Sequence, residues 1–207
     1  MPKKIDHDKQ REIFAQAAFR VLVRKGLADT TLRDVANEAG FTTGALAHYV
    51  HTKDELLLAA VKHMSDRIFL ELTKEEAFHD VEAFRRVLHG ALPISPTQKV
   101  FWRVNFNFWE RAQQDDAMRN LLQTSYARWQ SYLMRFLRVL RDDGKISSQL
   151  DLQEVAQSAI ALVDGIAVRT LVAGLDTAPR KSTKLVDAWI ERTLGYKPRP
   201  LRRPRKA

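Results

Sequence analysis

The sequence predicts an all-α protein in which a small N-terminal three-helix domain is joined to a larger helical bundle. Apolar residues recur at three- and four-residue steps, no segment alternates as a strand does, and no internal repeat is present. The chain has 207 residues, which is enough for a small domain and a larger one. We place the small domain at 1–52, the bundle at 53–196 and a basic, disordered tail at 197–207.

The first helix is expected from about Asp8 to Lys25. Its apolar residues share one face, and Gly26 supplies the left-handed conformation that commonly ends a helix. This face is made of Ile13, Phe14, Ala17, Ala18, Val21 and Leu22.

A second helix is expected from Thr31, whose hydroxyl can accept a hydrogen bond from a free backbone amide at the helix start. Asp34 stands three residues later and can reach back, which completes a capping box. Gly40 ends this helix in a tight turn, and Phe41 is expected to fill the space under the turn.

A third helix, opened by Thr42 or Thr43, buries Leu46 and Val50 at a four-residue step. Two short helices around a glycine turn predict a helix-turn-helix, which places the start of its second helix in the DNA major groove. The residues directed outward are Thr43, Gly44, Ala45, Ala47, His48 and Tyr49. On spacing alone, the alternative is a capped helical hairpin without a partner.

Thr52 begins a further helix, with Glu55 expected to complete a capping box and Lys53 placed where a helix start meets a phosphate. The apolar pattern continues towards Lys74, so this helix is long enough to link the two domains. We expect it to act as the lever between them.

The run GFTTGALAHYVHTKDEL, residues 40–56, resembles the signature that ends the DNA-binding domain of TetR-family transcriptional regulators. The resemblance covers roughly residues 9–56 and departs from the family at Ala47, commonly an aromatic residue, and at Val50, usually Phe. It implies two sets of DNA contacts. Phosphates would be held by Thr30, Thr31, Tyr49 and Lys53, and bases would face Thr42, Thr43, Gly44, Ala45 and His48.

In the second domain, a short amphipathic helix is expected from about Asp80 to Ala91. The next helix has Ser95 as its N-cap and Gln98 as the capping partner. Its wide aromatic surface predicts a central helix of the bundle, and ligand sites are built between such facing helices. Its rings are either core side chains or part of a ligand site. Along one line of the helix stand Trp102, Phe106 and Trp109.

A long helix from about Asp115 to Arg141 carries Tyr126 and precedes a helix capped by Asp151 and Glu154. The latter is apolar almost all round, so we expect it to face the core on one side and a second copy of itself on the other. With the last helix, about Arg180 to Leu194, it would form an intermolecular four-helix bundle. The predicted homodimer interface is Ala159, Val163, Ala167, Leu171, Leu185 and Trp189.

The segment LVDGIAVRTLVAG, residues 162–174, is similar to the corresponding helix of the choline-responsive, BetI-type branch of the TetR family. Asp164 is the one acid inside this apolar helix, and a buried carboxylate is costly without a partner. It either pairs with an arginine such as Arg169 or helps to attract a cation. In the second case the rings of Trp102, Phe106 and Trp109 would form an aromatic cage, joined by Tyr126. The effector is therefore an unidentified small molecule, cationic or amphipathic, and choline-like ligands are permitted.

Composition argues against several classes of function. The chain has no cysteine, its six histidines form no HExxH motif, and it has no phosphate-binding glycine loop. We therefore expect no enzyme activity, no metal and no cofactor. No apolar run approaches the ~20 residues of a membrane span, so we expect no membrane partner and a cytoplasmic protein.

The net charge of +9 is concentrated at the C-terminus, where residues 196–207 hold six basic side chains and no acid. Such a tail either adds non-specific attraction to nucleic acid or aids solubility. The sequence as a whole predicts a ligand-released repressor that binds a pseudo-palindromic operator in double-stranded DNA as a homodimer. The alternative is an architectural DNA-binding protein that needs no effector.

Overall fold

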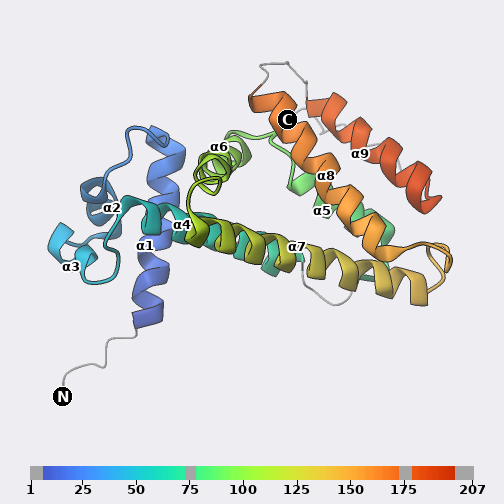
Figure 1. The fold of residues 1–207 in the computed structure, drawn as a ribbon, viewed down its shortest axis with the longest axis horizontal. Helices are drawn as coiled ribbons and strands as arrows, with labels where there is room; N and C mark the ends of the chain where they lie inside the picture. Colours follow the sequence, from blue (N-terminus) through green and yellow to red (C-terminus); the bar gives the residue numbers. More distant parts are fainter. Residues whose placement is uncertain (1–6, 73–77, 173–178, 199–207) are drawn as a thin grey trace, which may run out of the picture. The chain divides into compact units, whose positions relative to one another are not determined.

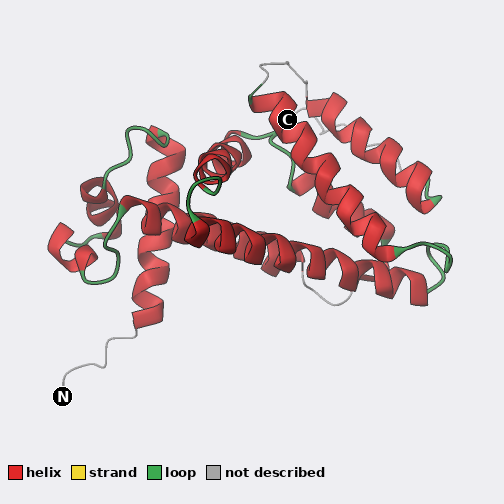
Figure 2. Cartoon of the chain, viewed as in Figure 1, coloured by secondary structure: helices red, strands yellow, loops and turns green. Residues whose placement is uncertain are grey.

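The computed structural model describes residues 7–72, 78–172 and 179–198. Over these residues the chain forms nine helices and no strand (Figure 1; Figure 2), which confirms the all-α prediction. The helices are α1 (His7–Lys25), α2 (Leu32–Ala39), α3 (Thr43–Ala47), α4 (Lys53–Leu72), α5 (Val81–Gly90), α6 (Pro96–Arg111), α7 (Asp116–Asp142), α8 (Leu152–Leu171) and α9 (Pro179–Leu194). None of the helices in these segments is both long and apolar enough to cross a membrane.

The chain divides into two compact units that are each discontinuous in sequence. Unit 1 contains Met1–Glu71 and Ser95–Arg119, and unit 2 contains Leu72–Ile94 and Asn120–Ala207. Helix α6, which the sequence assigned to the bundle, therefore packs with the N-terminal helices. The domain boundary at residues 52 and 53 stays a prediction. The expected end of α4 at Lys74 and tail residues 199–207 lie outside the described residues.

In unit 1, α1 packs against α2, and α2 packs against α3. Phe14 of α1 is completely buried, and its ring centroid lies 5.3 Å from that of Phe41 and 5.6 Å from that of Tyr49. Leu46 and Val50 are buried as predicted. Phe41 differs, because 38% of its surface stays exposed. Its ring packs edge-on against the buried Phe14, so it is buried only in part.

The ends of the first two helices follow the sequence prediction. Thr31 Oγ1 accepts a hydrogen bond from the Asp34 N–H, and the Asp34 carboxylate accepts one from the Thr31 N–H, so the capping box is present. Gly26 and Gly40 have φ of 84° and 77°. Glycine enters this left-handed region without strain.

At the starts of α4 and α8, one of the two predicted capping residues does not bond as expected. Thr52 Oγ1 accepts from the Glu55 N–H at 3.1 Å, but the Glu55 carboxylate accepts from the His51 N–H at 2.8 Å and not from that of Thr52. At α8 the cap is Asp151 alone, whose carboxylate accepts from the backbone N–H groups of residues 153 and 154. In both cases the first residue of the pair is enough to cap the helix.

Ion pairs fix α2 on α1. Lys25 Nζ lies 2.7 Å from Asp34 Oδ1, and the Glu38 carboxylate accepts hydrogen bonds from Arg20 and Arg24 at 2.8 and 2.9 Å. The bond from Lys25, followed by that from the Thr31 hydroxyl, lowers the pKa of Asp34 to about 2. Exposed pairs of this kind contribute little stability individually. Their effect is to turn the acidic side chains of α2 towards α1.

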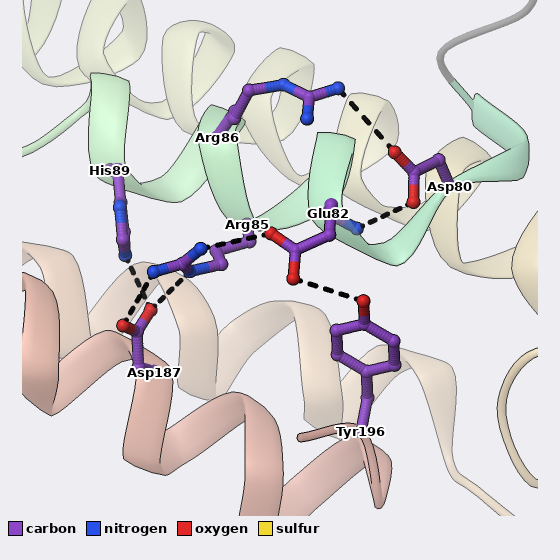
Figure 3. A network of polar contacts seen from close by, with 7 residues as sticks. All are labelled: Asp80, Glu82, Arg85, Arg86, His89, Asp187 and Tyr196. Atoms are coloured by element: carbon purple, nitrogen blue, oxygen red, sulfur yellow. Dashed lines mark hydrogen bonds and ion pairs between the residues drawn. The ribbon is translucent and has the colours of Figure 1, made fainter. Parts of the chain in front are cut away.

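In unit 2, α9 packs against α5 and α8. A polar network crosses the contact between α5 and α9 (Figure 3), and at its centre Arg85 is 4% exposed. Its Nε and Nη2 donate to the two carboxylate oxygens of Asp187 at 2.6 and 2.8 Å, and its Nη1 donates to Glu82 at 3.0 Å. Tyr196 Oη donates to the other oxygen of Glu82 at 3.0 Å, and His89 Nε2 lies 2.8 Å from Asp187 Oδ1. Burial lowers the pKa of His89.

Candidate DNA-binding surface and effector site

Helix α3 presents its first turn to solvent. Thr42, Thr43 and Gly44 are exposed, as is His48, which ends the helix, while Ala45 is half-buried. Thr42 Oγ1 caps the helix by accepting from the Ala45 N–H at 3.1 Å. A Cβ added at Gly44 would meet only Thr42 Oγ1, at 3.9 Å. Small side chains at the start of an exposed helix allow close approach to base edges in the major groove.

Thr30 and Thr31, assigned to phosphate by the resemblance, both have partners within the chain. Thr30 is buried, and its hydroxyl donates to the Gly26 carbonyl at 2.6 Å. The Thr31 hydroxyl is exposed and is engaged in the cap of α2. A phosphate contact at Thr30 would therefore have to use its backbone N–H, and both contacts stay predictions.

Tyr49 and Lys53 are also engaged inside unit 1. Tyr49 is half-buried with its ring against that of Phe14. Lys53 Nζ donates to the carbonyl oxygens of Leu27 and Ala28, at 3.0 and 3.4 Å, in the loop between α1 and α2. The ammonium group that is expected to hold a phosphate thus closes this loop.

Arg33 is a basic residue of this surface that the sequence analysis did not single out. It is exposed on α2, and among the described residues it has no ion-pair or hydrogen-bond partner. The first helix of a helix-turn-helix crosses the DNA backbone, where a guanidinium suits a phosphate. The signal was present in the sequence, because the buried residues Val35 and Ala36 place Arg33 on the opposite face of α2.

The aromatic residues of α6 form one cluster in unit 1. The ring centroid of Trp102 lies 5.8 Å from that of Phe106 and 5.9 Å from that of Trp109, and the last two lie 5.0 Å apart. Trp102 is buried, whereas Phe106 and Trp109 are half-buried. Helix α6 packs on α1, and Arg111 in its last turn forms an ion pair with Asp54 in the first turn of α4.

Asp164 has a different partner from the one considered from sequence. Tyr126 Oη donates to Asp164 Oδ2 at 2.9 Å. Arg169 is exposed, and within the described part of the chain Asp164 has no ion pair. Burial raises the pKa of Asp164 to about 6, against the lowering effect of the Tyr126 hydroxyl. The pair belongs to unit 2 and the α6 rings to unit 1, so a single cage that unites them stays a prediction.

Three of the residues predicted to form the dimer interface do not face outward from the chain. Ala159, Val163 and Ala167 are buried inside their own chain, because α8 turns this side towards the core of its unit. Leu171 and Trp189 are half-buried, and Leu185 is 46% exposed. The uncovered side of α8 includes Ala161, Gly165, Val168 and Val172, and the exposed polar residues Gln157 and Arg169 lie beside them.

Comparison with known families gives matches in both parts of the chain. Residues 15–60 match the family of bacterial regulatory proteins, tetR family, and residues 80–195 match the BetI-type transcriptional repressor, C-terminal family. The HTH-type transcriptional regulator PksA of Bacillus subtilis is 31% identical over 175 residues, which cover 83% of each protein. The regulator BetI of Brucella suis is 26% identical over 203 residues, which cover 96% of this chain and 98% of BetI.

Solved structures share the fold. A protein of Rhodococcus sp. described as a TetR-family regulator has a TM-score of 0.73 at 22% identity and covers 90% of this chain and 99% of its own. A Saccharomonospora viridis protein described as a transcriptional regulator, in complex with choline, has a TM-score of 0.68 at 24% identity. The match covers 89% of this chain and 96% of that protein. The curated relatives are named as regulators, which supports the expectation of a protein that is not an enzyme. This chain therefore belongs to the TetR family of bacterial transcriptional regulators, and its C-terminal part is of the BetI type.

Proposed function

We propose that this regulator is a repressor that binds a pseudo-palindromic operator as a homodimer and leaves it when a small-molecule effector binds. The observation that carries the proposal is the exposed surface of α3, where Thr43 and Gly44 at its start and His48 at its end face solvent on a helix packed against α2. Thr43 and His48 carry hydrogen-bonding groups that can read base edges, and Gly44 lets the backbone come close. Thr42 and Ala45 complete the base-facing set.

Phosphate contacts from both sides of this surface would fix the docking of α3. We assign them to Thr31, Tyr49 and Lys53, with the backbone of Thr30, and we add Arg33. For Lys53, a phosphate would replace the Leu27 carbonyl as acceptor. The exchange is favourable because a hydrogen bond between two charged groups is stronger than one to a neutral carbonyl.

The homodimer is proposed to form through the uncovered sides of α8 and α9. Val168, Val172 and Leu185 are large apolar side chains exposed at 38%, 66% and 46%. Gly165 lies between them along α8, and a Cβ there would meet nothing within 4 Å in the same chain. Glycine in a helix interior costs about 1 kcal/mol relative to alanine, which is consistent with a second helix coming close at this position.

The effector is proposed to be a small cationic or amphipathic molecule. Two observations support this class: the aromatic cluster of Trp102, Phe106 and Trp109, and the pair of Asp164 and Tyr126. Ring faces attract an ammonium group. The BetI-type match and the choline complex of the Saccharomonospora viridis protein point to the same class.

Release would proceed through α6 and α4. Helix α6 is joined to the first turn of α4 by the Arg111–Asp54 ion pair, and α4 begins at Lys53, which closes the loop before α2. A displacement of α6 by the effector would therefore move the start of α4 and with it the helix-turn-helix. A coupling of a few kcal/mol is enough, because ligand and DNA bias the same two states.

The proposal is tested by selecting bound duplexes from a random DNA pool and then screening small molecules for release of the selected sequence. A pseudo-palindromic consensus and a releasing ligand are expected. Recovery of DNA without sequence preference, and without release by any ligand, would favour the architectural alternative.

A further inference from the structure

Asp164 lies in the middle of α8, between the N-cap Asp151 and the last helical residue Leu171. Its charge is therefore too far from either helix end to be stabilised by the helix dipole. Asp164 is half-buried: one turn away on the helix, Ile160 and Ala167 are buried, whereas Ala161 and Val168 are exposed. The carboxyl group thus lies at the border between the buried side and the uncovered side of α8.

Only one of its two oxygens has a hydrogen-bond partner in the part of the chain that the structure describes. Oδ2 accepts from Tyr126 Oη at 2.9 Å, whereas Oδ1 has no hydrogen-bond partner among the residues that the structure describes. An ionised carboxylate in this setting lacks the paired charge that burial requires. Burial accordingly raises the pKa of Asp164 to about 6, so the carboxyl group can both hold and release a proton near neutral pH.

The charged groups of the elements around Asp164 do not compensate it. On α8, Glu154 and Arg169 are exposed, and on α7, Arg128 is exposed. On α9, which packs against α8, Asp187 is held by Arg85. The remaining charged residues of α9, all exposed, are Arg180, Lys181, Lys184, Glu191 and Arg192.

We propose that Asp164 and Tyr126 form a proton-exchanging subsite, in which a monovalent organic ammonium ion takes the place of the proton that the Asp164 carboxyl group holds in the free protein. This rests on the proposed effector-released function and adds a regulation to it. The effector would bind more tightly as the pH rises, and the regulator would respond to acidity as well as to the ligand.

The surroundings select the class of cation. A small inorganic ion needs several oxygen ligands, and the described partners of this site supply one carboxyl group and one phenol. An alkylated ammonium ion has a weakly hydrated charge and apolar substituents, which suit a half-buried carboxyl group on a largely apolar helix. The Tyr126 hydroxyl keeps Oδ2 in place while Oδ1 meets the cation.

The size of the effect follows from proton linkage. With a carboxyl pKa of about 6, a cation that binds only the ionised form gains affinity by about tenfold between pH 5 and pH 7. Near pH 6 its binding releases about half a proton.

The experiment is isothermal titration calorimetry of the full-length protein with choline, and with 3,3-dimethyl-1-butanol as its uncharged analogue. Titrations at pH 5, 6 and 7 give the affinity, and titrations at pH 6 in two buffers of different ionisation enthalpy give the proton count. Wild-type protein is compared with Asp164→Asn and Tyr126→Phe. Glu154→Gln serves as the matched control, since it removes an exposed acid from the same helix.

For wild type and Glu154→Gln we expect a tenfold rise in choline affinity from pH 5 to pH 7, proton release, and no pH dependence for the alcohol. Asp164→Asn should lose the rise and the proton release, and Tyr126→Phe should keep both. Choline binding without pH dependence, or unchanged in Asp164→Asn, would overturn the subsite, as would a failure of choline to bind at any pH. Operator binding measured on the same samples reports on the proposed function separately, because a protein without this subsite can still bind and release DNA.

Discussion

Arg85 on α5 and Asp187 on α9 form a two-point ion pair in which each carboxylate oxygen of Asp187 accepts from a different nitrogen of the guanidinium (Figure 3). The third guanidinium nitrogen of Arg85, Nη1, donates to the Glu82 carboxylate. The hydrogen bonds from Arg85 to Asp187 and then to Glu82 raise the pKa of Arg85. The pair joins two helices that are about one hundred residues apart in sequence. Because the guanidinium is buried, it depends on these partners for its hydrogen bonds.

Removing Asp187 alone should therefore be costly. Asp187→Ala leaves a buried guanidinium with one partner fewer, and we expect unit 2 to lose about 3 kcal/mol of unfolding free energy. Urea unfolding followed by circular dichroism measures this loss. Arg86→Ala is the control, since the Arg86–Asp80 pair is exposed and 3.6 Å long and should change stability by less than about 0.5 kcal/mol. Equal effects of the two variants would contradict a buried role for the pair.

The raised pKa of Asp164 gives a stability profile with a defined sign. The folded state holds the proton more tightly than the unfolded chain, so this contribution is complete below about pH 3.8 and is lost as the pH rises through about 6. Asp164→Asn does not titrate. Its free energy of unfolding should match that of wild type near pH 4 and exceed it by at most about 3 kcal/mol at pH 7.

Unfolding of wild type and Asp164→Asn at several pH values tests this, because the difference between the two proteins removes the titration of other groups such as His89. A difference that shrinks as the pH rises would show that the sign is wrong.

Much of the fold was predictable because it depends on local chemistry. The cap at Thr31, the left-handed Gly40 and the cap at Ser95 are set by neighbouring residues, and all three are present. The side of α8 that faces the core of its own chain was not predictable. A helix that is apolar all round gives no periodic signal for which side meets its own core, so Ala159 and Ala167 were assigned to a partner although they are buried within the chain.

The candidate sites were predictable to different degrees for the same reason. The exposed residues Thr43 and His48 follow from helix periodicity close to the turn. The partner of Asp164 is Tyr126, 38 residues away on another helix, and no spacing rule connects them. Lys53 bonds to a loop 26 residues before it, which the capping pattern at Thr52 does not indicate.

Lys53 should contribute to DNA affinity without contributing to sequence preference. Lys53→Ala is expected to weaken binding to all duplexes alike and to reduce the slope of log affinity against log salt by about one. Fluorescence anisotropy over a range of salt concentrations measures both. Thr43→Ala is the matched contrast: it should keep the slope and lose on the order of 1 kcal/mol of discrimination at one base pair. Unchanged affinity and slope in Lys53→Ala would refute the proposed docking.

The homodimer should dissociate when a charge is placed on the uncovered side of α8 or α9. Val168→Glu and Leu185→Glu put an unpaired carboxylate into the proposed apolar seam, so both should be monomeric by light scattering and should bind operator DNA more weakly. Ala167→Asp is expected to destabilise the protomer instead, because Ala167 is buried. Lys145→Glu, at an exposed position after α7, is the control. A wild-type protein that is monomeric at micromolar concentration would rule out this architecture.

Trp109 is the best test of the aromatic part of the effector site, because it is half-buried and in contact with the half-buried Phe106, whereas Trp102 is buried. If Trp109 faces a desolvated cation, Trp109→Ala should weaken ligand binding by about 2 kcal/mol, or roughly thirtyfold, and Trp109→Phe should lose less. Calorimetry with choline, betaine aldehyde and larger apolar amines provides the measurement, and operator affinity without ligand separates a lost contact from a disturbed fold.

Trp102→Ala should instead lower the unfolding free energy by about 3 kcal/mol or more, since it leaves a cavity among buried rings. Binding of neutral or anionic compounds alone would refute the cation cage and would leave the assignment of the chain to the TetR regulators unchanged.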